Sequence, residues 1–200
     1  MTSVILDVAG VCNLALAKAG YALRVGSLYD GTVAAKKLLD IYGQERDGLL
    51  SEGEWDFCER TVTGTLQKAA PPSYVTTPWN PVYPALPWRF QYAYPADAVK
   101  IRTVKAQAVT IPNFDPRYNR FSEDNDPSLN QKVILCNVPN AIIVYAGQVT
   151  DPNQWTATFL DALADRIARP MAMVLKDLNT AKFVAGVEQA ETVEAADTRS

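Results

Sequence analysis

Histidine is absent from this sequence of 200 residues, and its absence excludes several kinds of active site. Without an imidazole there is no Ser-His-Asp or Cys-His pair, no histidine general base and no histidine-bearing zinc site. The phosphate-binding motifs GxxxxGK[ST] and GxGxxG are also missing. An enzyme built from this chain would therefore have to use carboxylate chemistry.

Cysteine is scarce, and its placement argues against a disulfide framework. The three cysteines, Cys12, Cys58 and Cys136, are odd in number, lie far apart and form no Cys-x-x-Cys motif. This pattern is typical of reduced thiols in a cytosolic protein. We expect all three side chains to pack as small apolar groups.

Long apolar runs and a basic field are lacking as well. No stretch reaches the ~18 consecutive apolar residues of a membrane span, and the first 20 residues lack the features of a signal peptide. The net charge of −3 and pI near 5.0 do not favour sequence-specific binding to nucleic acid. We expect a globular chain that is made in the cytosol, with no membrane contact.

Three helical patterns occupy the first 70 residues. The first follows a cap at Thr2 or Ser3, and Gly20 is placed to end it. The second follows a cap at Asp30 and breaks near residues 51–53. The third ends before Pro71 and places four apolar residues on one face: Trp55, Cys58, Val62 and Leu66.

A two-residue rhythm between residues 88 and 104 indicates strands. Its first half alternates up to Tyr94, and after Pro95 the alternation resumes, which predicts a second strand that pairs back on the first. Residues 132–136 and 141–146 predict a further hairpin. We therefore expect one sheet of about four strands.

The last long pattern predicts a helix with Asp151 as its cap and Pro152 at its first position. Its apolar stripe comprises Trp155, Phe159, Leu163, Ile167, Met171, Val174 and Leu178. The patterns together predict an α+β fold: an antiparallel α-helical bundle with a small, mostly antiparallel β-sheet inserted between the third helix and the long C-terminal helix. The predicted segments are 1–70 (N-terminal helices), 71–87 (proline-rich connector), 88–148 (inserted sheet, with a long loop at 107–131), 149–179 (C-terminal helix) and 180–200 (acidic tail).

Two of these segments admit a second interpretation. The connector at 71–87 is either a stiff spacer or a polyproline ligand for an aromatic groove. The excursion at 107–131 is either a surface loop or a two-stranded finger, and its length is typical of an interaction surface. Its acidic run at residues 124–126 lacks the ligand spacing of an EF-hand, so we predict no metal.

Carboxylates offer two places where a glycoside hydrolase site could be built. One is the group Glu52, Glu54, Asp56 and Glu59, and the other is Asp161 with Asp165. The first group surrounds a predicted helix start, where the helix dipole favours acidic residues. The second pair is spaced four apart, as on an exposed helix face. We therefore predict a protein that is not an enzyme and has no cofactor, with a hydrolase as the alternative.

Three stretches contain ordered residue patterns, which we call phrases, and each pattern is more specific than any single residue. The first has a helix ending in LAKAG, a long helix with an Arg-Asp pair, then W.F and an arginine: Leu16, Ala17, Ala19, Gly20, Ser27, Asp30, Tyr42, Arg46, Asp47, Leu49, Leu50, Trp55, Phe57 and Arg60. The second is an aromatic strand, a proline turn with an aspartate, and a strand with an arginine: Trp88, Tyr92, Tyr94, Pro95, Asp97, Ile101, Arg102 and Val104. The third is a strand with a tyrosine, a VTDP start and an alanine-rich helix: Tyr145, Val149, Thr150, Asp151, Pro152, Trp155, Phe159, Ala162, Leu163, Ala164 and Ala168.

In this order and spacing, the phrases resemble the head-to-tail adaptor proteins of bacteriophages, the tail tubular protein A-like connector family. The resemblance implies a structural virion protein, made in the host cytoplasm, that forms a twelvefold ring joining the portal protein to a downstream tail or nozzle protein. DNA would pass through the lumen during ejection without sequence-specific binding. A protein that assists assembly but never enters the virion is a further alternative.

The resemblance also implies where partners bind. The portal would contact the acidic tail: Phe183, Val187, Glu188, Glu191, Glu194, Asp197 and Arg199. The tail component would contact the excursion: Asn113, Phe114, Asp115, Arg117, Tyr118, Arg120 and Phe121. The expected structural core comprises Trp55, Phe57, Trp88, Tyr92, Tyr94, Trp155, Phe159 and Leu163.

Overall fold

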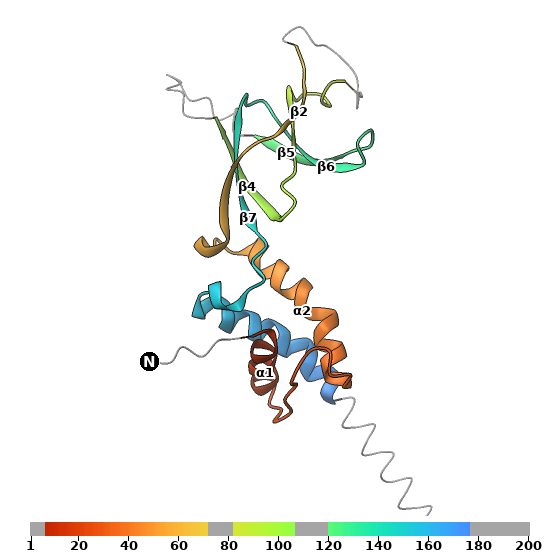
Figure 1. Cartoon of the computed structure of the whole chain (residues 1–200), viewed down its shortest axis with the longest axis vertical. Helices are drawn as coiled ribbons and strands as arrows, with labels where there is room; N and C mark the ends of the chain where they lie inside the picture. The colour runs from red at the N-terminus through yellow and green to blue at the C-terminus, as the bar shows by residue number, and fades with distance from the viewer. Residues whose placement is uncertain (1–6, 72–81, 107–119, 177–200) are drawn as a thin grey trace, which may run out of the picture. The chain divides into compact units, whose positions relative to one another are not determined.

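A computed structural model describes residues 7–71, 82–106 and 120–176, which divide into two units (Figure 1). The helical unit contains the described residues up to Leu49 and from Val149 onward. The β unit contains the described residues between Leu50 and Gln148. The described residues form an α+β structure with three α-helices and seven strands.

The first helix of the helical unit, α1 (Val8–Lys18), is held at both ends by local hydrogen bonds. The Asp7 carboxylate caps it and accepts a hydrogen bond from the Gly10 amide at 2.7 Å, so the predicted cap at Thr2 or Ser3 is wrong. Gly20 ends it as predicted, with a φ of 85° that few other residues adopt. The Gly20 and Tyr21 amides donate back to α1 carbonyls at 3.0 Å each, which completes a Schellman motif.

The second helix, α2 (Val33–Glu52), begins two residues later than its sequence pattern indicates. Its cap is Thr32, whose hydroxyl accepts a hydrogen bond from the Ala35 amide at 3.2 Å. Asp30, the predicted cap, instead accepts hydrogen bonds from the Thr32 amide at 3.0 Å and hydroxyl at 2.7 Å. Asp30 therefore positions the capping residue.

The C-terminal helix is described over residues 157–176. A 3-10 turn, η3 (Pro152–Gln154), precedes it, and Asp151 caps that turn rather than the helix. The Phe159 amide donates to the Thr156 hydroxyl at 3.3 Å, which makes Thr156 the cap of the helix. Its buried face comprises Phe159, Leu163, Ile167, Met171 and Leu175, and Trp155 is buried just before the helix. Of the other predicted stripe residues, Val174 is half-buried because the buried face passes through Leu175, and Leu178 lies outside the described residues.

The β unit contains a 3-10 turn, η1 (Asp56–Cys58), and two antiparallel sheets. The strands are β1 (Glu59–Thr63), β2 (Leu66–Ala69), β3 (Phe90–Ala93), β4 (Ala98–Ala106), β5 (Phe121–Asp126), β6 (Gln131–Cys136) and β7 (Ala141–Gly147). One sheet has the order β1-β7-β4, and the other has the order β2-β3-β6-β5. The prediction of a helical bundle with one small inserted sheet is therefore wrong.

The third helix of that predicted bundle does not form. Its residues instead make η1, β1 and β2. Two causes favour this outcome: the β-branched run 61–63 prefers an extended backbone, and β1 gains its hydrogen bonds from β7, about eighty residues away.

Both predicted hairpins are also wrong, because the chain changes sheets between their strands. β3 pairs with β2 and β6, whereas β4 pairs with β7. Likewise β6 and β7 belong to different sheets. The turns at Pro95–Asp97 and Asn137–Asn140 therefore act as corners between the two sheets.

Residues from both sheets share one apolar core, which explains why the chain changes sheets. It comprises Tyr92, Ile101, Val104, Ile134, Cys136, Val138, Ala141, Ile143 and Tyr145. The Tyr92 hydroxyl donates to the Val138 carbonyl at 2.8 Å, which fixes the corner between β6 and β7. On the opposite face of β6, Val133 and Leu135 pack against Ala85 and Trp88.

The excursion predicted as a loop at 107–131 is a strand over part of its length. Residues 107–119 lie outside the described residues, but 121–126 form β5 and pair with β6. The turn between them includes Asn130, whose φ of 50° is tolerated by asparagine. This segment is therefore an edge of the four-stranded sheet.

Candidate functional site

Most of the residues predicted to bind partners lie outside the described part of the chain. This holds for all seven residues assigned to the portal: Phe183, Val187, Glu188, Glu191, Glu194, Asp197 and Arg199. It also holds for five of those assigned to the tail component: Asn113, Phe114, Asp115, Arg117 and Tyr118. Of the other two, Arg120 is exposed, and Phe121 begins β5 and packs against the core of the β unit.

The residues expected in the core divide into two groups by burial. Tyr92, Trp155, Phe159 and Leu163 are buried. Trp55, Phe57, Trp88 and Tyr94 are half-buried. The Trp155 and Phe159 rings meet edge to face with centroids 5.1 Å apart, which favours a rigid junction at the start of the C-terminal helix.

Glu59, Asp161 and Asp165, three of the carboxylates considered for a hydrolase site, are engaged in ion pairs. The Lys18 ammonium lies 2.6 Å from Asp161 and 2.7 Å from Asp165, and their hydrogen bonds raise the pKa of Lys18. Glu59 pairs with Arg102 at 2.9 Å. These ion pairs link α1 to the C-terminal helix and β1 to β4.

A polar cluster in the β unit joins three distant parts of the sequence. Arg60 from β1 pairs with Asp97, and the Tyr145 hydroxyl from β7 donates to the same carboxylate at 3.0 Å. Burial, and then the hydrogen bond to Asp97, raise the pKa of Tyr145. Arg102, which lies in β4 after Asp97, donates a hydrogen bond to the Gly53 carbonyl at 3.1 Å. These contacts fix the ends of β1, β4 and β7 relative to one another.

A second polar cluster lies in the four-stranded sheet, and its members Lys68, Gln91 and Asp126 are buried. Asp126 pairs with the Lys68 ammonium and accepts hydrogen bonds from Gln91 Nε2 at 2.7 Å and the Ser128 hydroxyl at 2.6 Å. Burial alone would raise the pKa of Asp126, but these donors outweigh it and hold that pKa well below its usual value. The cluster thus stabilises a buried charge pair, and its chemistry is structural.

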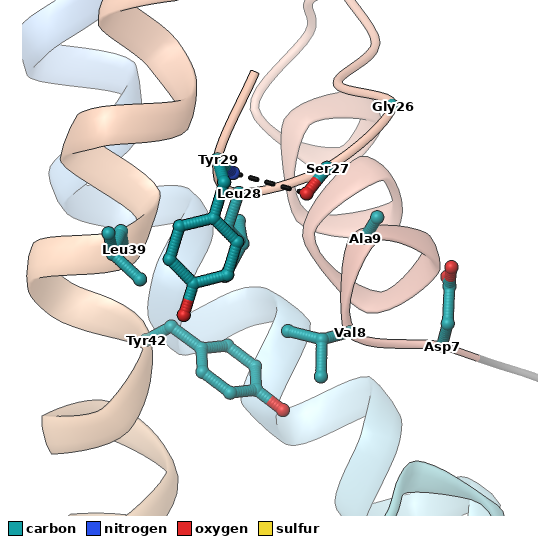
Figure 2. A pocket seen from close by; sticks show the side chains of 9 residues that line it. All are labelled: Asp7, Val8, Ala9, Gly26, Ser27, Leu28, Tyr29, Leu39 and Tyr42. Atoms are coloured by element: carbon teal, nitrogen blue, oxygen red, sulfur yellow. Dashed lines mark hydrogen bonds between the residues drawn. The ribbon is translucent and has the colours of Figure 1, made fainter. Parts of the chain in front are cut away.

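An open cavity lies in the helical unit and was not predicted from the sequence. It measures about 420 Å³ and is lined by Asp7, Val8, Ala9, Gly26, Ser27, Leu28, Tyr29, Leu39 and Tyr42. Figure 2 shows these side chains converging from the start of α1, the segment 26–29 and α2. We call it the α1–α2 cavity. A volume of this size is within the range of sites that bind small molecules or partner side chains.

The segment that forms one wall of the cavity is held by hydrogen bonds from α1. The Asn13 side chain donates to the Val25 carbonyl at 2.9 Å and accepts from the Val25 amide at 2.8 Å. The Tyr29 amide then donates to the Ser27 hydroxyl at 3.2 Å, drawn as a dashed line in Figure 2. Tyr29, at the end of this segment, is 82% exposed beside the cavity.

Tyr42 is the chemically unusual residue of the cavity. It is buried, and its hydroxyl has no hydrogen-bond partner among the described residues. Burial raises the pKa of Tyr42 to about 12, against the opposing effect of Arg46, whose guanidinium lies 5.7 Å from the ring centroid. The lining of the cavity thus combines two tyrosines, the Asp7 carboxylate and the Ser27 hydroxyl with aliphatic side chains.

Metal and membrane features are missing from the part of the chain that the structure describes. No cluster of three or more histidine, cysteine or acidic side chains is placed to hold a metal ion there. No helix there has the length and apolar character needed to cross a membrane. Comparison with known proteins found no matching family model and no matching curated protein.

Proposed function

We propose that this chain is a structural virion protein: a phage head-to-tail adaptor whose ring joins the portal to the tail and continues the DNA channel. It would act without catalysis or a cofactor, at the head-to-tail interface of the particle. Its partners would be further copies of itself, the portal protein and a downstream tail or nozzle protein.

The cluster of Arg60, Asp97 and Tyr145 carries this proposal. Each of these residues belongs to a different one of the three phrases that resemble the adaptor family. In the structure the two side chains from β1 and β7 meet on the Asp97 carboxylate. A shared contact gives a physical reason for the three phrases to occur together, which supports a common fold with the adaptors.

Other residues of the phrases also have structural roles. Gly20 ends α1, and Arg46 pairs with the adjacent Asp47 at 2.8 Å. In the third phrase, the Trp155 indole donates to the Val149 carbonyl at 3.1 Å across the turn that Asp151 caps. The resemblance is therefore carried by residues that shape turns and junctions, and it supports a shared architecture more directly than a shared active site.

The charge of the chain is compatible with a DNA channel. A net charge of −3 gives a weakly acidic surface, past which DNA can slide without strong attachment. The C-terminal segment from Phe183 onward would bind the portal, and the excursion that includes Arg120 would bind the tail component.

The proposal is tested by mixing the chain with the portal protein encoded beside it and measuring the mass of the complex by native mass spectrometry. We expect a symmetric ring of this chain on the portal, whether or not the isolated chain is already assembled. A chain that stays monomeric beside the portal and cleaves peptidoglycan would overturn the proposal in favour of a hydrolase.

A truncated chain tests the portal assignment separately. Deletion of residues 188–200 is expected to leave folding intact and to weaken portal binding, because the acidic segment is removed. If the truncated chain binds the portal as tightly as the full chain, the portal contact lies elsewhere.

A further inference from the structure

The α1–α2 cavity is an open site with mainly apolar and aromatic walls. Its walls include Leu28 and Leu39, and two aromatic rings, Tyr29 and Tyr42, face it from different segments (Figure 2). The Tyr42 hydroxyl is itself buried, so an occupant of the cavity meets the ring of Tyr42 and not its hydroxyl. The best occupant is therefore apolar and makes good contacts with aromatic rings.

Methionine meets both requirements. Its thioether is flexible and apolar, and it packs favourably against aromatic rings. Met173, on the C-terminal helix, has 73% of its surface exposed. It is thus a candidate for burial in a contact with another molecule.

Met173 is far from the cavity of its own chain. The Tyr21 hydroxyl, just after the end of α1, donates to the carbonyl of the adjacent Ala172 at 3.4 Å. The cavity lies at the opposite end of α1, and the helix between these ends is roughly 15 Å long at 1.5 Å per residue. Met173 can therefore reach an α1–α2 cavity only in another copy.

The charges beside the two surfaces are complementary. Asp7 lines the cavity and Asp30 follows Tyr29, and both aspartates are exposed. Arg169 lies one helical turn before Met173, is exposed, and forms no ion pair with the described residues. A helix face that carries a cation beside an exposed methionine thus matches an apolar cavity with acidic neighbours.

We propose that Met173 of one copy inserts into the α1–α2 cavity of the next copy, with Arg169 beside Asp7 and Asp30. The two surfaces are different patches of the same unit, so the contact is heterologous and repeats around a closed ring or along a filament. The proposal specifies a subunit contact of the proposed adaptor ring and rests on that function.

Cysteine trapping tests the contact directly. One tagged chain carries Met173→Cys, and a differently tagged chain carries Leu39→Cys at the cavity; the native cysteines are buried. The matched control is Leu14→Cys, because Leu14 and Leu39 are both 42% exposed on helices of the same unit, but only Leu39 lines the cavity. Under a mild oxidant we expect at least roughly tenfold more disulfide-linked product with Leu39→Cys, since docked residues have an effective concentration near the millimolar range.

A second variant, Met173→Glu, is expected to reduce association by roughly tenfold or more, because it places a carboxylate in an apolar cavity with acidic neighbours. Equal trapping at the two cysteine positions would overturn the contact. If trapping is equal but a ring still forms on the portal, the adaptor function is supported and only the proposed contact is overturned. Selective trapping without any portal complex would support the contact and overturn the adaptor function, and equal trapping without a complex would overturn both.

Discussion

The interiors of the two units are built from different chemistry. In the helical unit the three helices bury mainly apolar stripes, and most charged pairs are at the surface, as in Lys18 with Asp161 and Asp165. In the β unit, Lys68 and Asp126 are buried as a pair, with Gln91 donating to the same carboxylate. The helical interior is therefore specified by spacing along the chain, and the β interior by partners that are far apart in sequence.

The largest effect is expected for Asp126→Ala, which breaks the buried pair of the β unit. It leaves the Lys68 ammonium buried beside Ser128 without its carboxylate. Breaking such a pair typically costs about 3 to 5 kcal/mol. Urea denaturation of the purified variant measures the loss.

The matched control removes both charges together, as Lys68→Met with Asp126→Leu. Replacing a buried pair by apolar side chains of similar size is often neutral or stabilising. The double variant should therefore be more stable than Asp126→Ala alone. A double variant that is as unstable as the single one would show that the pair does more than neutralise charge.

A comparable loss is expected in the helical unit from Leu163→Ala, through a purely apolar mechanism. Leu163 is fully buried in the stripe of the C-terminal helix. Truncating a buried leucine typically costs about 2 to 5 kcal/mol through lost transfer energy and the cavity left behind. The exposed Leu14→Ala is the control, and its free energy of unfolding should change by less than about 1 kcal/mol.

Acid should affect the β unit through Asp126. Its pKa is lowered in the folded chain, so its contribution to stability is complete above the unfolded pKa near 4 and is lost as pH falls toward the folded value. Over that range this single group contributes a decline of about 1.4 kcal/mol per pH unit. Urea denaturation between pH 5 and 2, at roughly half-unit steps, measures the free energy of unfolding, which should decline less steeply for Asp126→Asn than for the wild type. Equal slopes would contradict the role of Asp126 in this acid sensitivity.

The smallest effects are expected from glycine-to-alanine substitutions, one in each unit. A methyl group added by Gly64→Ala in the β unit would lie 2.7 Å from the ring of buried Tyr92, and such overpacking costs about 1 to 3 kcal/mol. Gly43→Ala in α2 meets no atom within 4 Å and removes a helix-weakening glycine, so it should stabilise the chain by about 0.5 to 1 kcal/mol. Thermal denaturation of both variants should show shifts of opposite sign, and shifts of the same sign would mean that the two interiors respond alike.

The sequence predicted the helical unit better than the β unit, for a physical reason. The spacing of Phe159, Leu163 and Ile167 identifies a buried helix face by itself, and Gly20 ends α1 through its own backbone freedom. Trp55, Cys58 and Val62 have helical spacing too, but pairing of β1 with β7 overrides it. Local patterns carry no information about such distant partners.

The cavity in the helical unit could not be predicted from local sequence patterns either. Nothing in the spacing of Tyr29 and Tyr42 brings them together, since the cavity depends on the hydrogen bonds between Asn13 and Val25. The predicted portal residues, from Phe183 onward, lie outside the described part of the chain. Their assignment remains a prediction from the family resemblance.

The central claim is that this chain is a ring component of the phage particle, and its abundance in purified virions tests that claim most directly. Quantitative mass spectrometry of washed particles would compare it with the portal protein. We expect a fixed ratio close to one adaptor per portal subunit, as a ring seated on the portal requires. Absence from the particles, with the chain still abundant in infected cells, would contradict the adaptor and favour an assembly factor.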